Sequence, residues 1–269
     1  MKIPFVKLHG AKNDFLLTPV SSVEGIDEAE YPAIAVAICH RYTGVGGDGW
    51  MLIDSAPGPG FDASIRLFNS DGSEPELSGN GTRCAAALLA RDHEDQTEFR
   101  IRTGAGIKHL RLILRQEFEY QFEMNMGDIR VVDLHATVSG RDAVIADAGN
   151  PQCAFPVADF NFDWRALGAA VEREARFPNR TNVSFFVPVD RHTIDVRFWE
   201  RGAGETNSSG TGSTGAAVAA MGRGLVENPV TILTPAGALT LRQADGVYLT
   251  GPAVWVAEGF CAYAKIRSL

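Results

Sequence analysis

Hydrophobic and polar positions alternate along many short stretches of the chain, as in strands that are buried on one face. The clearest examples are DASIRLF at 62–68 and most of residues 97–126. Further strands are predicted at 3–8, 15–20, 130–138, 143–148, 183–189, 193–199, 230–234, 238–242, 247–250 and 254–264. Helices are fewer, and the pattern predicts them at 29–40, 81–91, 163–174 and 212–223. Because strands and helices do not alternate strictly, as they would around a parallel sheet, we predict an α+β fold.

One motif occurs twice. Ser78–Ala86 reads SGNGTRCAA, and Ser209–Ala217, which begins 131 positions later, reads SGTGSTGAA. This offset is about half the chain, so it predicts two related halves, residues 1–127 and 128–262, with a strand at about 263–269 that returns to the first half. Each motif leads into a predicted helix, whose first turn carries unpaired N–H groups and a partial positive charge. Two such helix starts facing each other would form a cradle for a carboxylate.

Composition narrows the classes of function. The formal net charge of −8 and the pI of about 5.3 disfavour nucleic-acid binding, which needs a basic face. No apolar run approaches the length of a membrane span and the first residues lack a signal-peptide core, so we expect a cytoplasmic protein without a membrane partner. The four cysteines are scattered without a Cys-x-x-Cys pair, which disfavours zinc and disulfides, and we predict no metal site.

Familiar cofactor and nucleophile motifs do not fit this chain. Gly210–Gly215 satisfies G-x-G-x-x-G, but the polar segment ERGAGETNSS separates it from the preceding strand, unlike in a dinucleotide site. Neither Ser78 nor Ser209 lies in a G-x-S-x-G nucleophile elbow. Neither motif contains a lysine, which disfavours pyridoxal phosphate chemistry. We therefore predict no cofactor.

Two further positions carry alternatives. Asn13 lies in the polar turn HGAKND, where a lone asparagine most simply closes a hairpin. Glu200 and Arg201 are adjacent opposite charges in the glycine-rich loop ERGAGET. Either a binding site or a solvated ion pair would explain them, and the residues alone leave both open.

Six stretches together resemble the diaminopimelate epimerase family, the cofactor-independent isomerases of lysine and cell-wall biosynthesis. They fall in the family's order and spacing from residue 9 to about 217, and they read HGAKNDF, RYTGVGGDG, FNSDGSEPELSGNGTRCAAA, GNPQC, FPNRTNV and ERGAGETNSSGTGS. The resemblance implies two pseudo-symmetric halves, each a curved and mostly antiparallel sheet around a central helix, with the substrate in a cleft between them. It also implies inversion at the α-carbon of LL- or meso-diaminopimelate, a small amino acid, by a homodimer.

The resemblance further implies a set of site residues. The α-carboxylate would lie on the two helix N-termini, and the distal amino-acid end would be held by asparagines together with Glu200 and Arg201. Arg201 suits a carboxylate because its donors form a planar fork. The implied substrate-binding residues are Asn13, Asn69, Gly79, Asn80, Asn150, Asn182, Glu200, Arg201, Gly210 and Thr211.

The chain departs from the family at its most reactive positions. The family has catalytic cysteines where this chain has Ser78 and Ser209, and a histidine where it has Gln152. A serine hydroxyl is far less acidic than a thiol and needs a neighbouring base. We therefore predict proton abstraction slower by several factors of ten, each about 1.4 kcal/mol of barrier. The serines fit substitutions made to trap a substrate, a natural lineage with altered chemistry, or a protein that only binds.

Three hypotheses follow. The first is an epimerase or racemase of this family that uses Ser78 and Ser209 as its catalytic residues. The second keeps the fold but isomerises or dehydrates another small acid, because the thiol pair is missing. The third is a non-catalytic amino-acid-binding protein, because the recognition residues are intact beside weakened chemistry.

Overall fold

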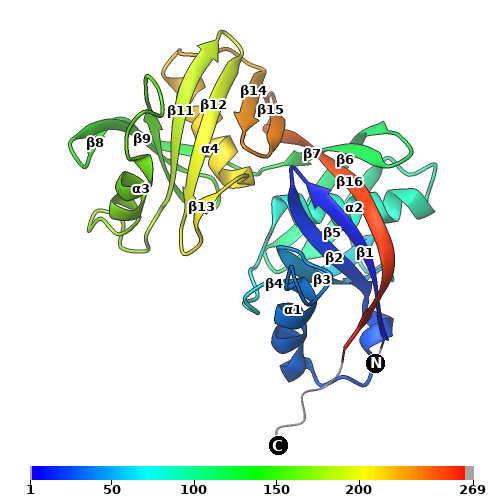
Figure 1. Ribbon diagram of the computed structural model, residues 1–269. Coiled ribbons are helices and arrows are strands. Elements are labelled where there is room, and N and C mark those ends of the chain that lie inside the picture. Colours follow the sequence, from blue (N-terminus) through cyan, green and yellow to red (C-terminus); the bar gives the residue numbers. More distant parts are fainter. Residues whose placement is uncertain (1, 264–269) are drawn as a thin grey trace, which may run out of the picture. The chain divides into compact units, whose positions relative to one another are not determined.

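The computed structural model describes residues 2–263, and Figure 1 shows them coloured along the chain. These residues form mostly strands, with four α-helices. They divide into two compact units: unit 1 runs up to Glu123 and resumes at Pro252, and unit 2 is Met124–Gly251. The chain passes between the units within β7 (Glu119–Asn125) and again within β16 (Val247–Ala262). The predicted returning strand at 263–269 lies, from 264 on, outside the described residues.

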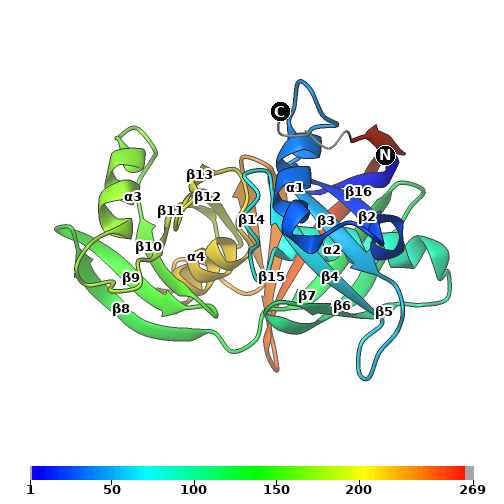
Figure 2. The ribbon, with the colours of Figure 1, turned by 90° about the horizontal axis from the view of Figure 1, so that it is seen from below.

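In unit 1 a sheet closes on itself. Its strands follow the order β1-β2-β3-β4-β5-β6-β7-β16, and β16 pairs again with β1. Helix α2 packs against β1, β2, β4, β5 and β6, while α1 packs against β3 and β4 (Figure 2). Besides β7 and β16, the elements are β1 (Lys2–Gly10), β2 (Asn13–Pro19), two short 3₁₀ turns (Val20–Val23 and Glu28–Glu30), α1 (Tyr31–Cys39), β3 (Gly49–Asp54), β4 (Ala63–Asn69), α2 (Gly79–Asp92), β5 (Glu98–Thr103) and β6 (Gly106–Arg115).

Unit 2 repeats this plan with an open sheet. Its strand order is β16-β15-β14-β12-β11-β10-β9-β8, with β13 paired to β12. Helix α4 packs on this sheet, and α3 covers β11 and β12. The elements are β8 (Arg130–Val138), β9 (Arg141–Asp147), β10 (Pro151–Pro156), α3 (Trp164–Glu172), β11 (Asn182–Asp190), β12 (Thr193–Glu200), β13 (Gly204–Thr206), α4 (Gly210–Gly222), β14 (Val230–Thr234) and β15 (Gly237–Gln243).

The two units place their parallel strand pairs at corresponding points. These pairs are β2–β3 and β4–β5 in unit 1, and β10–β11 and β12–β14 in unit 2. A parallel pair needs a crossover connection. The crossover contains α2 between β4 and β5, and α4 between β12 and β14. The repeated sequence motif therefore opens the corresponding helix in each unit.

Helices α2 and α4 are enclosed on nearly all sides because their residues are small. Residues 84–87 of α2 are fully buried, and all residues of α4 from Gly212 to Ala220 are buried. A Cβ added at Gly212 would lie 2.9 Å from a ring carbon of Phe198, and one added at Gly81 would lie 2.7 Å from the methyl carbon of Met51. The glycines and alanines thus let each sheet approach its helix closely.

The mixed class predicted from the pattern agrees with the structure, and so do the four helices. Two predicted boundaries are wrong. Helices α2 and α4 begin at Gly79 and Gly210, two residues before the predicted starts, because the preceding serine caps each one. The two strands predicted at 247–250 and 254–264 are one strand, β16. This strand pairs with β15 up to Thr250 and with β1 from Val254, so Pro252, which has no N–H, lies where the partners change. Strands β3, β10 and β13 were not predicted.

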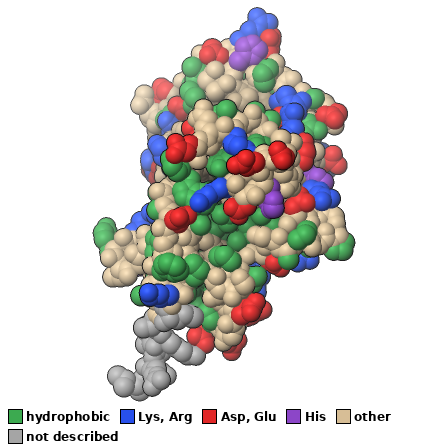
Figure 3. Space-filling model, turned by 90° about the vertical axis from the view of Figure 1, so that its right-hand side faces the viewer, with side chains coloured by type: hydrophobic (Ala, Val, Ile, Leu, Met, Phe, Trp, Pro, Cys, Tyr) green, Lys and Arg blue, Asp and Glu red, His purple; other side chains and the backbone are tan. Residues whose placement is uncertain are grey.

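Charged side chains of both signs are interspersed on the face shown in Figure 3. Exposed arginines elsewhere in the fold are commonly paired: Arg66 contacts Glu28 at 2.7 Å and Glu74 at 3.0 Å. Such exposed pairs contribute little to stability, about 0–1 kcal/mol each. Among the described residues, no helix has both the length and the apolar character to cross a membrane.

Candidate functional site

Ser78 and Ser209 cap the helices α2 and α4 in the same way. The hydroxyl oxygen of Ser78 accepts a hydrogen bond from the N–H of Gly81, and that of Ser209 accepts one from the N–H of Gly212, both at 3.1 Å. Both serines have extended backbone conformations, as an N-cap requires. A cap satisfies one of the four unpaired N–H groups of a helix start, so donors remain in the first turn for an anion. The repeat in sequence is therefore also a repeat in geometry.

Ser209 has an acidic partner. Its hydroxyl donates to Oε2 of Glu200 at 2.8 Å, and the other oxygen of Glu200 accepts from the hydroxyl of Thr206 at 2.6 Å. Because a hydroxyl has one hydrogen, the Gly212 N–H and the Glu200 carboxylate together fix the orientation of Ser209. Burial raises the pKa of Glu200, while the bonds from Thr206 and Ser209 act in the opposite direction. Glu200 is thus a carboxylate with a raised pKa that accepts a hydrogen bond directly from a serine.

Ser78 has different surroundings. It is half-buried and lines a cavity of about 260 Å³ that is formed by the segment 74–77, the end of β4 and the turn between β5 and β6. Within unit 1, as far as it is described, no carboxylate is hydrogen-bonded to the Ser78 hydroxyl. The two serines therefore share their backbone geometry but differ in their chemistry.

None of the three buried cysteines is suited to act as a reactive thiol. Burial raises the pKa of Cys84, the cysteine closest in sequence to Ser78, to about 12. Burial also raises the pKa of Cys39 and of Cys153 to about 12. Thiols in this state are almost wholly protonated near neutrality and are poor nucleophiles and bases.

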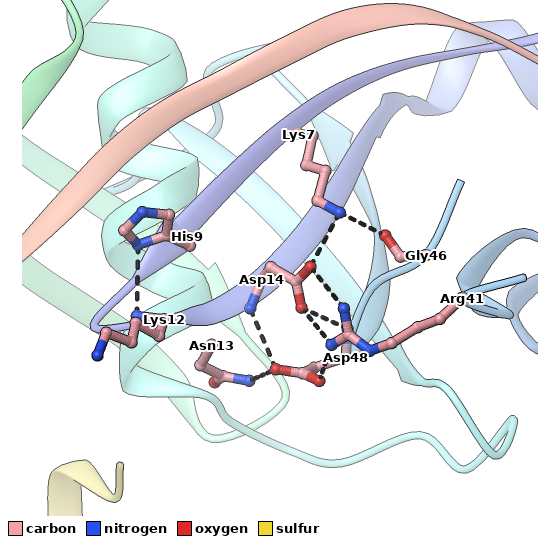
Figure 4. A network of polar contacts seen from close by, with 8 residues as sticks. All are labelled: Lys7, His9, Lys12, Asn13, Asp14, Arg41, Gly46 and Asp48. Carbon is pink, nitrogen blue, oxygen red and sulfur yellow. Dashed lines mark hydrogen bonds and ion pairs between the residues drawn. The ribbon is translucent and has the colours of Figure 1, made fainter. Parts of the chain in front are cut away.

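Asn13 does more than close a hairpin. The turn itself is made by Ala11 and Lys12, both with left-handed φ angles of 50° and 59°, and Asn13 begins β2 opposite Gly10. Its side-chain amide donates to Oδ2 of Asp48 at 2.7 Å (Figure 4). Its oxygen accepts from the amide of Asn80 at 3.2 Å. The simple turn interpretation from sequence therefore omitted half of what this residue does.

A cluster of two acids and two cations surrounds that asparagine. Asp14 accepts from Arg41 at 2.8 Å and contacts Lys7 at 3.0 Å, and Arg41 also bonds Asp48 at 2.7 Å (Figure 4). Burial alone would raise the pKa of Asp14, but the hydrogen bonds and charges of Arg41 and Lys7 lower it below its ordinary value. Lys7 also donates to the carbonyl of Gly46 at 2.8 Å. The cluster holds the loop between α1 and β3 against the first hairpin.

Two hydrogen bonds join predicted recognition residues of unit 2 to each other, Asn150 with Thr211 and Asn182 with Arg201. Asn150 donates to the hydroxyl of Thr211 at 3.4 Å and accepts from the amide of the buried Gln152 at 2.5 Å. The oxygen of Asn182 accepts from the N–H of Arg201 at 3.0 Å. Gln152 thereby orients a neighbouring asparagine.

Glu200 and Arg201 do not act as one charged pair. Glu200 bonds Ser209 and Thr206, whereas the guanidinium of Arg201 donates to the carbonyl of Asn179 at 3.1 Å. No ion pair joins Glu200 and Arg201 in the part of the chain that the structure describes. The solvated-pair interpretation of this dipeptide is therefore wrong.

Glu172 is an organising residue that the sequence did not indicate. This buried carboxylate at the end of α3 accepts from the indole of Trp199 at 2.9 Å, the N–H of Gly202 at 3.0 Å and the guanidinium of Arg180 at 3.1 Å. Burial would raise the pKa of Glu172, but these donors lower it. It therefore ties the loop after β12, which carries Arg201, to the segment that leads into Asn182 at the start of β11.

The remaining predicted residues are distributed as follows. Gly79 and Asn80 form the first turn of α2, and Gly210 and Thr211 form that of α4. Asn69 ends β4, and its amide donates to the hydroxyl of Ser73 at 2.9 Å. No group of three or more metal-ligating side chains occurs among residues 2–263. The substrate-binding roles of all these residues stay predictions.

Comparison with known proteins identifies the family model, relatives and solved structures that this chain resembles. The family model described as "Diaminopimelate epimerase" matches residues 5–132 and 144–256. The chain is 34% identical over 274 residues to a diaminopimelate epimerase from Desulfitobacterium hafniense, covering 94% of this chain and 96% of that protein. It is 36% identical over 279 residues to one from Pseudomonas fluorescens, covering 96% and 99%. A solved PhzF-family phenazine biosynthesis protein from Bacillus anthracis has the same fold, with a TM-score of 0.68, 16% identity and coverage of 97% and 99%.

Proposed function

This chain belongs to the diaminopimelate epimerase family, and from that premise we propose that it inverts the α-carbon of LL- or meso-diaminopimelate without pyridoxal phosphate. The role is that of an isomerase in the biosynthesis of lysine and of peptidoglycan precursors. It includes the expectation of a cytoplasmic homodimer. The observation that carries the proposal is the pair of serine-capped helix starts, one in each unit, which have the same backbone geometry.

We assign the substrate's α-carboxylate to the first turns of the two central helices. Gly79 and Asn80 in α2, and Gly210 and Thr211 in α4, lie where backbone N–H groups are left over beyond the cap. Oriented N–H groups and the helix dipole stabilise negative charge on a carboxylate, and stabilise it further as the α-carbanion delocalises onto that group. Asn13, Asn69, Asn150, Asn182 and Arg201 are assigned to the remainder of the substrate.

Glu200 supplies the base that a serine needs. As the Cα–H bond breaks, its proton passes to the oxygen of Ser209, and the hydroxyl proton of Ser209 passes to Oε2 of Glu200. The electron pair stays on the substrate and delocalises onto its α-carboxylate. The 2.8 Å hydrogen bond between Ser209 and Glu200 supports this relay, because general bases act within hydrogen-bond reach. We assign to Ser78 the return of a proton to the other face of the carbon.

The difference between the serines supports a second candidate function. Ser209 is bonded to a carboxylate, while Ser78 has none bonded to it within its described unit. A reaction that removes a proton with one base, such as the isomerisation or dehydration of a related small acid, needs only the Ser209 side. We therefore keep such an isomerase or dehydratase as the alternative, and we place Ser78 and Ser209 at the family's two cysteine positions in both cases.

Deuterium exchange tests the proposed function. We expect LL-diaminopimelate incubated with the protein in deuterated buffer to gain α-deuterium and to yield the meso isomer. Because Ser209 is hydrogen-bonded to a carboxylate and Ser78, within the described part of its unit, is not, exchange should exceed inversion. A Ser209→Ala variant serves as the control and should do neither. If calorimetry shows binding but neither isomer gains deuterium, the protein is a binder and the epimerase proposal fails, whereas turnover only of hydroxy or unsaturated acids would favour the alternative.

The pH dependence of turnover should report the ionisation of Glu200. The proposed base works only when ionised, and burial raises the pKa of Glu200 above its ordinary value of 4.5. We therefore expect kcat/KM to fall with decreasing pH, with an acid limb above the range of an exposed carboxylate. Thr206→Val removes a hydrogen bond that favours the ionised form, so it should move this limb to higher pH. A pH profile that is flat from pH 4 to 8 would count against Glu200 as the base.

A further inference from the structure

Arg83 is a buried cation that packing alone does not explain. It lies in α2, fully buried, and its Nη1 has no hydrogen-bond partner among the described residues. Its other nitrogens donate to neutral oxygens, from Nη2 to Oδ1 of Asn80 and from Nε to the carbonyl of Pro252 at 3.2 Å. Burial lowers the pKa of Arg83 to about 10, which still leaves it charged near neutrality. A buried charge without an acidic partner is costly, so its presence calls for a role.

A chain of hydrogen bonds leads from Arg83 to Asp48. Arg83 donates to the oxygen of Asn80, the amide of Asn80 donates to the oxygen of Asn13 at 3.2 Å, and the amide of Asn13 donates to Oδ2 of Asp48 at 2.7 Å. The Asn13–Asp48 end of this chain is visible in Figure 4. Asn80 and Asn13 are 67 positions apart, and Asn13 and Asp48 are 35 apart. This series of hydrogen bonds thus joins α2, the first hairpin and the loop before β3.

The residues at the two ends of this series of hydrogen bonds, Arg83 and Asp48, determine the direction in which each bond is donated. A guanidinium has only donors, so Asn80 must turn its oxygen toward Arg83. An ionised carboxylate has only acceptors, so Asn13 must turn its NH₂ toward Asp48. The middle bond, from the NH₂ of Asn80 to the oxygen of Asn13, is then the only consistent arrangement. An asparagine between neutral groups could rotate its amide by 180° and exchange donor for acceptor, but these two cannot.

We propose that Arg83 and Asp48 are positioning residues that fix the amide orientation of Asn80 and Asn13, and so set which atoms these asparagines offer to a substrate carboxylate or ammonium group. The proposal rests on the proposed function for the assignment of both asparagines to substrate. These hydrogen bonds use one amide hydrogen and one lone pair of the amide oxygen of Asn13. Its second hydrogen and second lone pair therefore point in fixed directions. A rotated amide would place an oxygen where the substrate requires a donor.

Steady-state kinetics of variants at Asp48 and at its partner Arg41 provide the first test. Asp48→Asn keeps the size of the side chain but no longer forces Asn13 to donate, so KM for diaminopimelate should rise about tenfold, with kcat changed by less than about twofold. Arg41→Gln is the matched control, because it removes the ion pair of Asp48 while leaving Oδ2 beside Asn13. If Arg41→Gln raises KM as much as Asp48→Asn does, loosening of the loop explains the effect and the proposal fails.

A double-mutant cycle tests action at a distance. Arg83→Lys should also raise KM about tenfold, because a lysine cannot bond Asn80 with the same fixed geometry. In an Asn80→Ala background the same change should have almost no effect on KM, since the side chain through which Arg83 reaches both asparagines is gone. Independent, additive effects would overturn the proposal. Should Arg83→Lys fail to fold, the cycle of Asp48→Asn with Asn13→Ala gives the same information, because Asp48 bonds Asn13 and reaches Asn80 through it.

A spectroscopic readout separates this inference from the proposed function. The side-chain NH₂ signals of Asn13 can be assigned by nuclear magnetic resonance, using Asn13→Ala to identify them, and they need no substrate. Asp48→Asn and Arg83→Lys should both shift these signals, while Arg41→Gln should shift them less. Unchanged signals in Arg83→Lys would overturn the inference even in an active enzyme. Shifted signals in a protein that neither binds nor converts diaminopimelate would support the fixed orientation and remove the proposed function instead.

Discussion

The Glu200→Gln variant is expected to convert diaminopimelate about 10²–10⁴-fold more slowly than the unaltered protein, the usual contribution of a positioned general base. Glutamine keeps the size of the side chain and a hydrogen bond to Ser209, but its amide oxygen cannot hold the proton that leaves the α-carbon. Serine is too weak an acid to replace that function by itself. The acid limb of the pH profile should disappear together with the activity.

Steady-state kinetics and the rate of deuterium incorporation at the α-carbon both measure this loss. Glu205→Gln is the matched control, since Glu205 is an exposed neighbour whose carboxylate pairs with Arg165 at 2.5 Å, whereas the hydroxyls of Ser209 and Thr206 bond Glu200. It should retain nearly full activity. Retention of more than about a tenth of the activity by Glu200→Gln would show that the proton leaves by another route, because it is ten times more than even the low end of a general base's contribution allows.

Cysteine at both serine positions is expected to raise the rate of epimerisation by about two orders of magnitude or more, each order being about 1.4 kcal/mol of barrier. A thiol has an ordinary pKa of about 8.5, and a position at a helix N-terminus lowers it, so a useful fraction is thiolate at neutral pH. The Ser78→Cys change should contribute most of the gain in inversion, because Ser78 is the serine without an acidic partner in its unit. Ser209→Cys has less to add beside Glu200.

The double Ser→Ala variant is the control for the cysteine pair and should be inactive in both exchange and inversion. Circular dichroism and thermal unfolding would establish that each variant is folded. An epimerisation rate in the double cysteine variant no higher than in the unaltered protein would mean that the rest of the site is not built for this inversion. The one-base isomerase or dehydratase would then be the better proposal.

Alternation predicts a strand most clearly where one face of the strand is exposed, and two of the strands that were not predicted, β3 and β10, are mostly buried. Residues 98–103 alternate in burial along β5, and that strand was predicted from its pattern. Strand β3, GWMLID, is buried at its first five positions, and β10, PQCAFP, is buried at its central four. A strand covered on both faces has no period of two to detect. The strands predicted at 247–250 and 254–264 are the single strand β16, in which Pro252, without an N–H, lies where the pairing partner changes.

Neighbours in the chain were enough to predict the mixed fold class, the duplicated motif and the helix that follows each copy of it, because turns and periodicity depend on residues only a few positions apart. The partners that give those residues their chemistry come from elsewhere. Glu200 meets Ser209 across the loop that follows β12, Asn13 meets Asp48 of the loop before β3, and Glu172 reaches Trp199 from α3. Burial, which raises the pKa of Glu200 and makes Arg83 costly, exists only once the sheets enclose their helices. Proton affinity and amide orientation were therefore decided by the tertiary structure, since both depend on which groups share a space from which water is excluded.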